Sequence, residues 1–331
     1  MSRERNRNYR ERVDKALATP RLQEALHTFG DAYVVARENA FAGLDFEAMR
    51  TGIAEMKDRV REQRGDLIAE FTRNAEAAGA TVYLARTAAD ANRYITGLAK
   101  ERGVRKLVKS KSMASEETHL NRALEAAGVE ALETDLGEWI IQLAGQRPSH
   151  MVMPAIHMFR DEVAELFGKV TGQVESDDIP HLVQVAREQL RQGYFDADMG
   201  ISGANMAIAE TGGIALITNE GNARLATTLP KIHVALVGLE KLVPTLEDAT
   251  NVMRVLPRNA TGQLLTSYVT WIRGAVPCGD GDKELHIVLL DNGRSALAES
   301  PQCRDALRCV KCGACANVCP VYPTVGGHVF G

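Results

Sequence analysis

Five of the six cysteines fall in one short stretch, Cys303–Cys319, and four of them have a spacing that could bind iron and sulfide. These four form a C-x2-C-x2-C-x3-C-P run, with which bacterial proteins hold [4Fe–4S] clusters: Cys309, Cys312, Cys315 and Cys319. Thiolates two residues apart can wrap a loop around one corner of a cubane. The small Gly313 and Ala314 would let backbone N–H groups approach the sulfides, and Pro320 would turn the chain out of the loop. Such a cluster carries one electron at a time.

A structural zinc site is the main alternative for these cysteines, and unliganded thiols are another. Zinc sites with four cysteines usually pair two C-x2-C units across a long spacer. The whole run occupies only residues 309–319, so it does not fit that plan. We therefore expect a [4Fe–4S] cluster rather than zinc.

The fourth ligand is an open question in the sequence. In two-cluster ferredoxins the fourth cysteine of such a run binds the other cluster, and no second run follows here. The chain could be truncated at its C-terminus with Cys319 directed to a second cluster, or Cys319 could close the site itself. Cys303 could also supply a ligand. We expect Cys278 to be a buried, small apolar side chain.

The rest of the composition is that of a globular protein. Of 331 residues, 45% are hydrophobic and 25% are charged, and the net charge of −4 gives no reason to expect a nucleic-acid partner. No apolar run approaches the roughly 18 residues that a membrane helix needs, and the N-terminus lacks the apolar core of a signal peptide. We therefore expect a cytoplasmic protein with no membrane span, whose thiols stay reduced.

Hydrophobic periodicity divides the chain into three parts. Residues 1–78 have helical spacing, 79–295 alternate strands with helices, and 296–331 form a cysteine module too small to fold on its own core. Strands are expected at 81–85, 106–109, 129–133, 151–153, 206–209, 213–218, 233–237 and 285–290. Helices are expected at 87–102, 116–127, 155–168, 178–192 and 246–255. This alternation predicts an α/β fold with one mainly parallel sheet covered by helices.

Polar side chains at strand ends suggest a second site. Lys109 and Lys111 follow a predicted strand and precede a helix, where backbone N–H groups favour an anion. Simple capping of that helix by Ser112 or Ser115 explains the same residues and is compatible with anion binding. Glu210 and Asn219 lie in polar loops whose composition turn chemistry alone could explain. Together the four predict a cleft for a small anion: Lys109, Lys111, Glu210 and Asn219.

Other common sites are missing from the sequence. It contains no G-x-G-x-x-G after a strand, no G-x4-G-K-[ST] and no G-x-S-x-G. The chain therefore shows no recognisable nicotinamide, flavin or nucleoside-triphosphate site. We expect His150 and His157, which flank a predicted strand end, to be structural rather than metal ligands.

Taken together, the polar motifs resemble the lactate-utilization iron–sulfur protein family (the LutB type) over nearly the whole chain. The matching segments are Lys109–Met113, Glu133–Glu138, Pro148–His150, Pro154–His157, Gly203–Asn205, Glu210–Gly212, Thr218–Arg224 and Arg308–Tyr322. The resemblance implies a LUD domain, similar to the NagB/RpiA/CoA-transferase α/β fold. It also implies a three-protein system that oxidises L-lactate to pyruvate, and a ferredoxin-type module with two [4Fe–4S] clusters. This sequence departs from that pattern because the second run and the tail after it are missing.

The function expected from the resemblance is that of an electron-transfer subunit. Oxidation of lactate releases two electrons and two protons, whereas a [4Fe–4S] cluster carries single electrons, so a partner subunit must supply the dehydrogenation. The chain is therefore expected to belong to an oxidoreductase complex rather than to be a stand-alone enzyme. The alternative is that the α/β domain binds or converts a small carboxylate such as lactate or pyruvate, with a structural or regulatory cluster. A third possibility is a scaffold that docks the other two proteins.

Overall fold

Parallel pairing runs through the whole of the larger sheet, whose strand order is β1-β12-β7-β4-β2-β3. The computed structural model describes residues 3–278, 281–327 and 329. The central strands β7 and β12 are runs of aliphatic residues buried over almost their full length, as expected for a sheet covered on both faces. The six strands, in spatial order, are β1 (Thr81–Ala85), β12 (Glu284–Leu290), β7 (Ile232–Gly238), β4 (Met199–Ser202), β2 (Lys106–Lys109) and β3 (Glu130–Glu133).

Alternate residues of the strands divide between two sides of this sheet. Val234 and Leu236 of β7 pack with α5 (Ala88–Glu101) and α7 (Leu120–Ala126) on one side. On the other side, Val108 of β2 packs with a helical group, while Ala235 and Val237 face a second sheet. That helical group consists of α8 (Leu136–Ala144), α9 (Arg160–Thr171), α10 (Ile179–Asp196) and α11 (Asn222–Thr228). The predicted α/β fold with helices on both faces is confirmed.

The second sheet is mixed, with the order β8-β5-β6-β9. Strands β5 and β6 pair antiparallel, as do β6 and β9, and β5 pairs parallel with β8. The strands predicted at 206–209 and 213–218 exist, but their expected place in the main sheet is wrong. The strands are β8 (Leu242–Val243), β5 (Met206–Ile208), β6 (Gly213–Thr218) and β9 (Tyr268–Ile272), and a short hairpin pairs β10 (Pro277–Cys278) with β11 (Gly281–Asp282).

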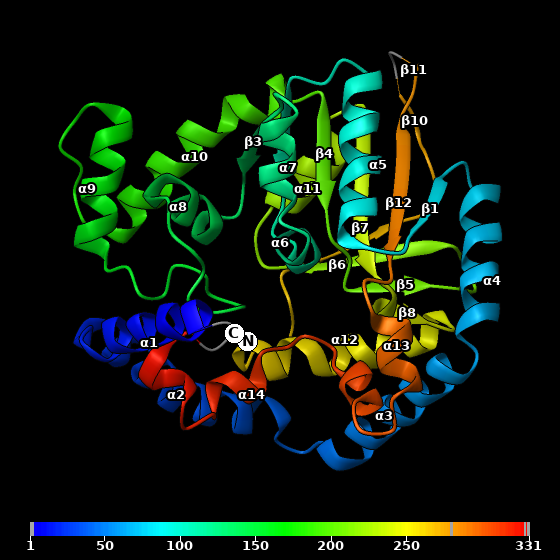
Figure 1. Cartoon of the computed structure of the whole chain (residues 1–331), viewed down its shortest axis with the longest axis horizontal. Coiled ribbons are helices and arrows are strands. Elements are labelled where there is room, and N and C mark those ends of the chain that lie inside the picture. Colours follow the sequence, from blue (N-terminus) through cyan, green and yellow to red (C-terminus); the bar gives the residue numbers. More distant parts are fainter. Residues whose placement is uncertain (1–2, 279–280, 328, 330–331) are drawn as a thin grey trace.

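Helices α1 (Arg3–Leu17), α2 (Pro20–Phe41) and α3 (Phe46–Glu62) and the cysteine region lie together below the sheets in the view of Figure 1. Helix α4 (Arg64–Ala77) stands beside the sheets next to β1. Helix α12 (Leu246–Thr261) packs on α2 and α3. After α13 (Arg294–Glu299), the described residues form only short helices: the 3-10 helix η2 (Arg304–Arg308), α14 (Ala314–Asn317) and α15 (Tyr322–Val325). The two ends of the chain thus meet, because α15 packs on α2.

Several predicted elements need correction. The helix expected at 116–127 is two helices, α6 (Met113–Glu117) and α7, separated by His119 in the left-handed conformation at φ 54°. The strand expected at 151–153 is wrong, since those residues form bends and the next helix begins only at Arg160. The predicted helices at 178–192 and 246–255 are confirmed as the longer α10 and α12.

Candidate iron–sulfur site

The four cysteines of the run lie on one irregular loop between η2 and α15. Cys309 ends η2, Cys315 lies in α14 and Cys319 follows it. The thiol-bearing residues Cys309 and Cys315 are exposed, whereas Cys312 and Cys319 are partly buried. The structure therefore places two of the candidate ligands at the surface and two against the protein interior.

Two left-handed residues shape this loop. Lys311 has φ 62° and Gly313 has φ 80°. The backbone N–H of Lys311 donates to the Sγ of Cys309 at 3.3 Å, which is the kind of N–H contact expected around cluster sulfur. A side chain at Gly313 would lie 3.0 Å from Val152 and 3.1 Å from the sulfur of Met151, so glycine suits both the conformation and the close packing.

Charge around Cys312 is poorly balanced without a metal. Burial raises the pKa of the Cys312 thiol, and the neighbouring Cys309 and Cys315 add to the rise, whereas the backbone N–H of Ala314 lowers it. Several like-charged thiolates close together are unfavourable unless a cation shares them. The grouping is therefore one that iron would stabilise.

A buried amide supports the fit of a cluster. The Nδ2 of Asn317, between Cys315 and Cys319, makes no hydrogen bond of normal geometry in the part of the chain described, and its nearest acceptor is the hydroxyl of Tyr33, which it reaches only weakly. Buried donors of this kind need a partner, and a cluster sulfide is an acceptor. Among the described residues, no set of three His, Cys, Asp or Glu side chains converges on a single ion position. The compact spacing of the run favours a cubane cluster over a zinc ion.

The loop is anchored to two distant parts of the chain. Arg308, directly before Cys309, forms a two-pronged ion pair with Asp58 of α3 at 2.6 and 3.1 Å. On the other side, His150 accepts the backbone N–H groups of Val152 and Met153 at its Nδ1, both at 3.1 Å. Its Nε2 therefore carries the proton and donates to the Oδ1 of Asn317 at 2.7 Å.

The histidines do not form a metal pair. His150 is occupied by backbone groups and Asn317, and His157 bonds Ser149 at 2.6 Å and Gln146 at 2.7 Å. Of the other two cysteines, Cys303 is an exposed thiol in the turn before η2. The side chain of Cys278 lies outside the described residues, so its predicted burial stays a prediction.

The four residues of the predicted anion cleft do not lie together, although the two lysines do. Lys109 is buried and its Nζ pairs with Glu133 at 2.8 Å and with the Oγ of Ser115 at 2.9 Å. The Nζ of Lys111 donates to the carbonyl of Val152 at 2.8 Å and lies 4.0 Å from Glu138. The two lysines therefore share one polar cluster with carboxylates at the ends of β2 and β3.

The other two members of that prediction lie elsewhere. Glu210 accepts the backbone N–H of Leu246 at the start of α12, at 2.9 Å. Asn219 donates to Gln263 at 2.8 Å and accepts from the N–H of Ser267 at 3.2 Å. Both act in loops around the second sheet, and none of these contacts involves Lys109 or Lys111.

The polar group of Lys109, Lys111, Glu133 and Glu138, which we call the lysine cluster, contains buried oxygens without a hydrogen-bond donor among the described residues. The described residues give no hydrogen-bond donor to three buried oxygens there: Glu133 Oε2, Glu138 Oε1 and Asn121 Oδ1. Burial and the charge of Glu116 raise the pKa of Glu138 to about 8. The sequence pointed to the carboxylates, but Asn121, which bonds Glu133 at 2.8 Å, was missed because it lies in the middle of a helical pattern.

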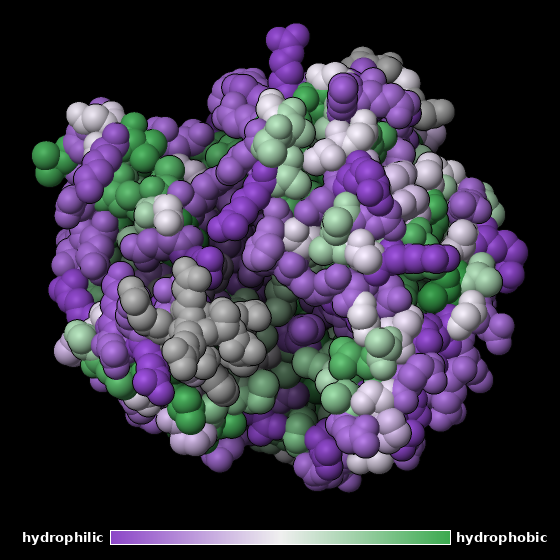
Figure 2. Space-filling view, in the orientation of Figure 1, coloured by the Kyte–Doolittle hydropathy of each residue, from purple (hydrophilic) through white to green (hydrophobic). Residues whose placement is uncertain are grey.

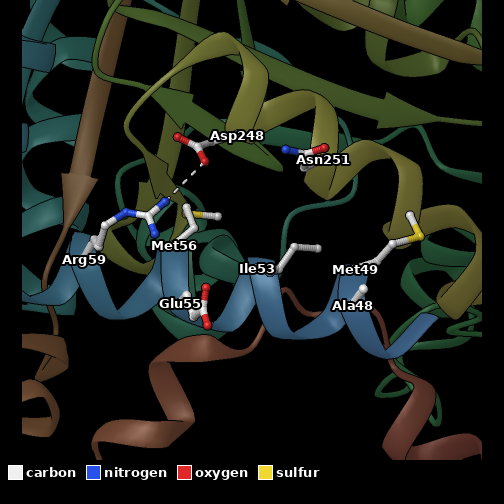
Figure 3. A pocket seen from close by; sticks show the side chains of 9 residues that line it. Ala48, Met49, Ile53, Glu55, Met56, Arg59, Asp248 and Asn251 are labelled. Carbon is white, nitrogen blue, oxygen red and sulfur yellow. Dashed lines mark ion pairs between the residues drawn. The ribbon is translucent and has the colours of Figure 1, made fainter. Parts of the chain in front are cut away.

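A cavity of about 430 Å³ lies between α3 and α12, and its lining includes no residue of the cysteine run or of the lysine cluster. Met49, Ile53 and Met56 point into it from α3, and an Arg59–Asp248 ion pair at 3.8 Å closes one end (Figure 3). On the face seen in Figure 2, hydrophilic residues dominate and hydrophobic ones form scattered groups. None of the described helices is both long and apolar enough for a membrane span.

Comparison with known proteins matches both parts of the chain. The LUD domain model matches residues 68–290, and a 4Fe-4S binding domain model matches 304–322, which include the four cysteines. Lactate utilization protein B of Shouchella clausii is 42% identical over 327 residues, with 98% of this chain and 69% of that protein covered. The same-named protein of Lysinibacillus sphaericus is 41% identical, again with 98% and 69% covered.

A relative with a different name matches this chain over the same share of both proteins. The uncharacterized electron transport protein YkgF of Escherichia coli is 38% identical, with 98% of this chain and 69% of that protein covered. A solved DUF162 family protein from Deinococcus radiodurans is 15% identical with a TM-score of 0.35, covering 69% of this chain and 98% of that one. The chain belongs to the lactate utilization protein B family, whose LUD domain it joins to a 4Fe-4S binding domain.

Proposed function

We propose that this chain is an iron–sulfur electron-transfer subunit of a cytoplasmic system that oxidises L-lactate to pyruvate together with partner subunits. The observation that carries the proposal is the C-x2-C-x2-C-x3-C run on a loop with a backbone N–H aimed at sulfur. The name lactate utilization protein B supports the role in lactate oxidation, and the name electron transport protein supports electron transfer. When bound, the cluster supplies single-electron transfer.

The cysteines of the loop would bind one cluster or two. Cys309, Cys312 and Cys315 would hold one cluster, and Cys319 would serve the same cluster or a second one. The exposure of Cys309 and Cys315 leaves this side of the loop open to a partner protein. Because lactate gives up two electrons and two protons, the partner would carry out the dehydrogenation and pass electrons singly.

Metal analysis and spectroscopy test this proposal. After anaerobic purification or reconstitution, the full chain should show a broad visible absorption band and an electron paramagnetic resonance signal on reduction. Cys312→Ala should lose most of the bound iron, because it removes a central thiol of the run. The matched control Cys303→Ala, outside the run, should keep it. Iron-free wild-type protein would overturn the proposal, and equal loss in the two variants would make Cys303 a ligand of the cluster as well.

A second candidate function is binding of a small hydroxy acid by the lysine cluster of the LUD domain. The three unpartnered oxygens favour this function, because the hydroxyl group of the ligand could donate to one of them. Lys111 could then pair with the carboxylate of the ligand. The cluster lies at the carboxyl ends of parallel strands, where α/β proteins commonly bind ligands.

Calorimetric titration of the full chain tests the second candidate. Lactate should bind in the millimolar range or tighter, and more tightly than pyruvate, which has no hydroxyl to donate. Glu138→Met, which removes the acceptor oxygens, should narrow the preference for lactate over pyruvate, while the exposed control Glu130→Met should preserve it. No heat of binding with either acid at millimolar concentrations would remove this function.

A further inference from the structure

One lysine contacts the cysteine loop next to Cys309, and a second lysine holds the turn that carries it. Lys57 of α3 is buried, with 6% of its surface exposed, and its Nζ donates to the carbonyls of Glu240 at 2.6 Å and Leu242 at 3.1 Å. Lys241 lies between those two residues, and its Nζ donates to the carbonyl of Val310 at 3.5 Å. Lys57 thus holds the turn from which Lys241 reaches the residue next to Cys309.

Neither lysine has a direct carboxylate partner among the ion pairs of the described residues. The nearest carboxylate, Glu240, is taken by Arg294, which also pairs with Glu117 at 2.8 Å. Buried cations are costly unless an anion balances them. Burial lowers the pKa of Lys57 to about 8 and lowers that of Lys241; in both, the charge of Glu240 opposes the shift most, and negative charge at Cys309 opposes it further. Because Glu240 is already paired with Arg294, an anionic group at Cys309 would add to an incomplete compensation of the two lysines.

We propose that Lys57 and Lys241 are positioning residues whose fixed charges raise the reduction potential of a cluster held at Cys309. This inference rests on the proposed function. Reduction adds one negative charge to the cluster, and a nearby positive charge in a poorly hydrated site stabilises the reduced form more than the oxidised form. Local charge and hydrogen bonding are among the known determinants of cluster potentials.

A potentiometric titration followed by electron paramagnetic resonance tests the role of Lys241. In the reconstituted full chain, Lys241→Met should favour the oxidised cluster about tenfold, which is a fall of about 59 mV in the midpoint potential of a one-electron couple. The control Lys169→Met removes an exposed lysine that pairs with Glu165 on α9 and should leave the potential unchanged.

A second variant guards against misfolding of the first. Glu240→Gln removes negative charge beside the lysines and should raise the potential, whereas general loosening of the loop would not reverse the sign. Equal potentials in Lys241→Met and Lys169→Met, or a fall in Glu240→Gln, would overturn this inference alone. Failure of the wild-type chain to bind a cluster would overturn the proposed function and this inference with it.

Discussion

Glu138 combines burial with a like-charged neighbour. Only 6% of its surface is exposed, and burial with the charge of Glu116 raises its pKa to about 8, while Lys111 only partly offsets the rise. The side chain therefore keeps its proton at neutral pH. A neutral carboxylic acid can donate a hydrogen bond, which a carboxylate cannot do.

The same proton makes stability depend on pH. An unfolded glutamate loses its proton near pH 4.3, so the folded chain binds more protons between there and about pH 8. Glu138 thus contributes stability below that window, and this contribution is lost as the pH rises through it, by up to about 1.4 kcal/mol per pH unit. Urea unfolding at pH 5 to 8 should show Glu138→Gln gaining stability relative to wild type as pH rises.

The exposed Glu130 on β3 supplies the control for that experiment. Glu130→Gln should follow the wild-type pH profile, because its side chain is 69% exposed. Parallel curves for Glu138→Gln and wild type would show that the buried carboxyl is ionised throughout.

At the scale of elements, the sequence predicted where strands occur better than which strands pair with one another. Short aliphatic runs between turns identified the central strands β7 and β12, which are buried over almost their full length. The edge strand β1 and the strand β2 were also predicted, although β1 is only partly buried and β2 begins and ends with lysine. The strands β5 and β6 have a composition similar to that of β7 and β12, but pairing partners lie far apart in the sequence and composition does not reveal them. Strand β4 was missed because Met-Gly-Ile-Ser contains a glycine and only one β-branched aliphatic residue.

The segment 151–153 also shows that apolar composition alone does not decide whether residues form a strand. Met151 and Val152 look like strand residues, yet they pack against Gly313 of the cysteine loop, and His150 holds the backbone beside them. The cysteine run could be predicted because its members are adjacent in sequence. The pairing of Lys109 with Glu133, and the approach of Lys241 to Val310, depend on the tertiary fold.

At the scale of the whole molecule, the two ends of the chain stabilise each other. Leu22 and Leu26 of α2 form an apolar cluster with Tyr322 and Val325 of α15, and Cys319 packs against it. The hydroxyl of Tyr322 also donates to the carbonyl of Ser149 at 2.7 Å, which ties α15 to the middle of the chain. The N-terminal helices therefore form the wall behind the last cysteine of the run.

That junction predicts a link between α2 and the reactivity of Cys319. Leu26 is 3% exposed, so Leu26→Ala should leave a cavity that costs about 2–5 kcal/mol of stability and should loosen α15. In reduced, cluster-free protein, alkylation of Cys319 followed by mass spectrometry should then be faster than in wild type. Val35→Ala, on the same helix at a residue 60% exposed, should not change the rate. Equal rates in the two variants would mean that α2 does not shield Cys319, and that the two ends of the chain move independently.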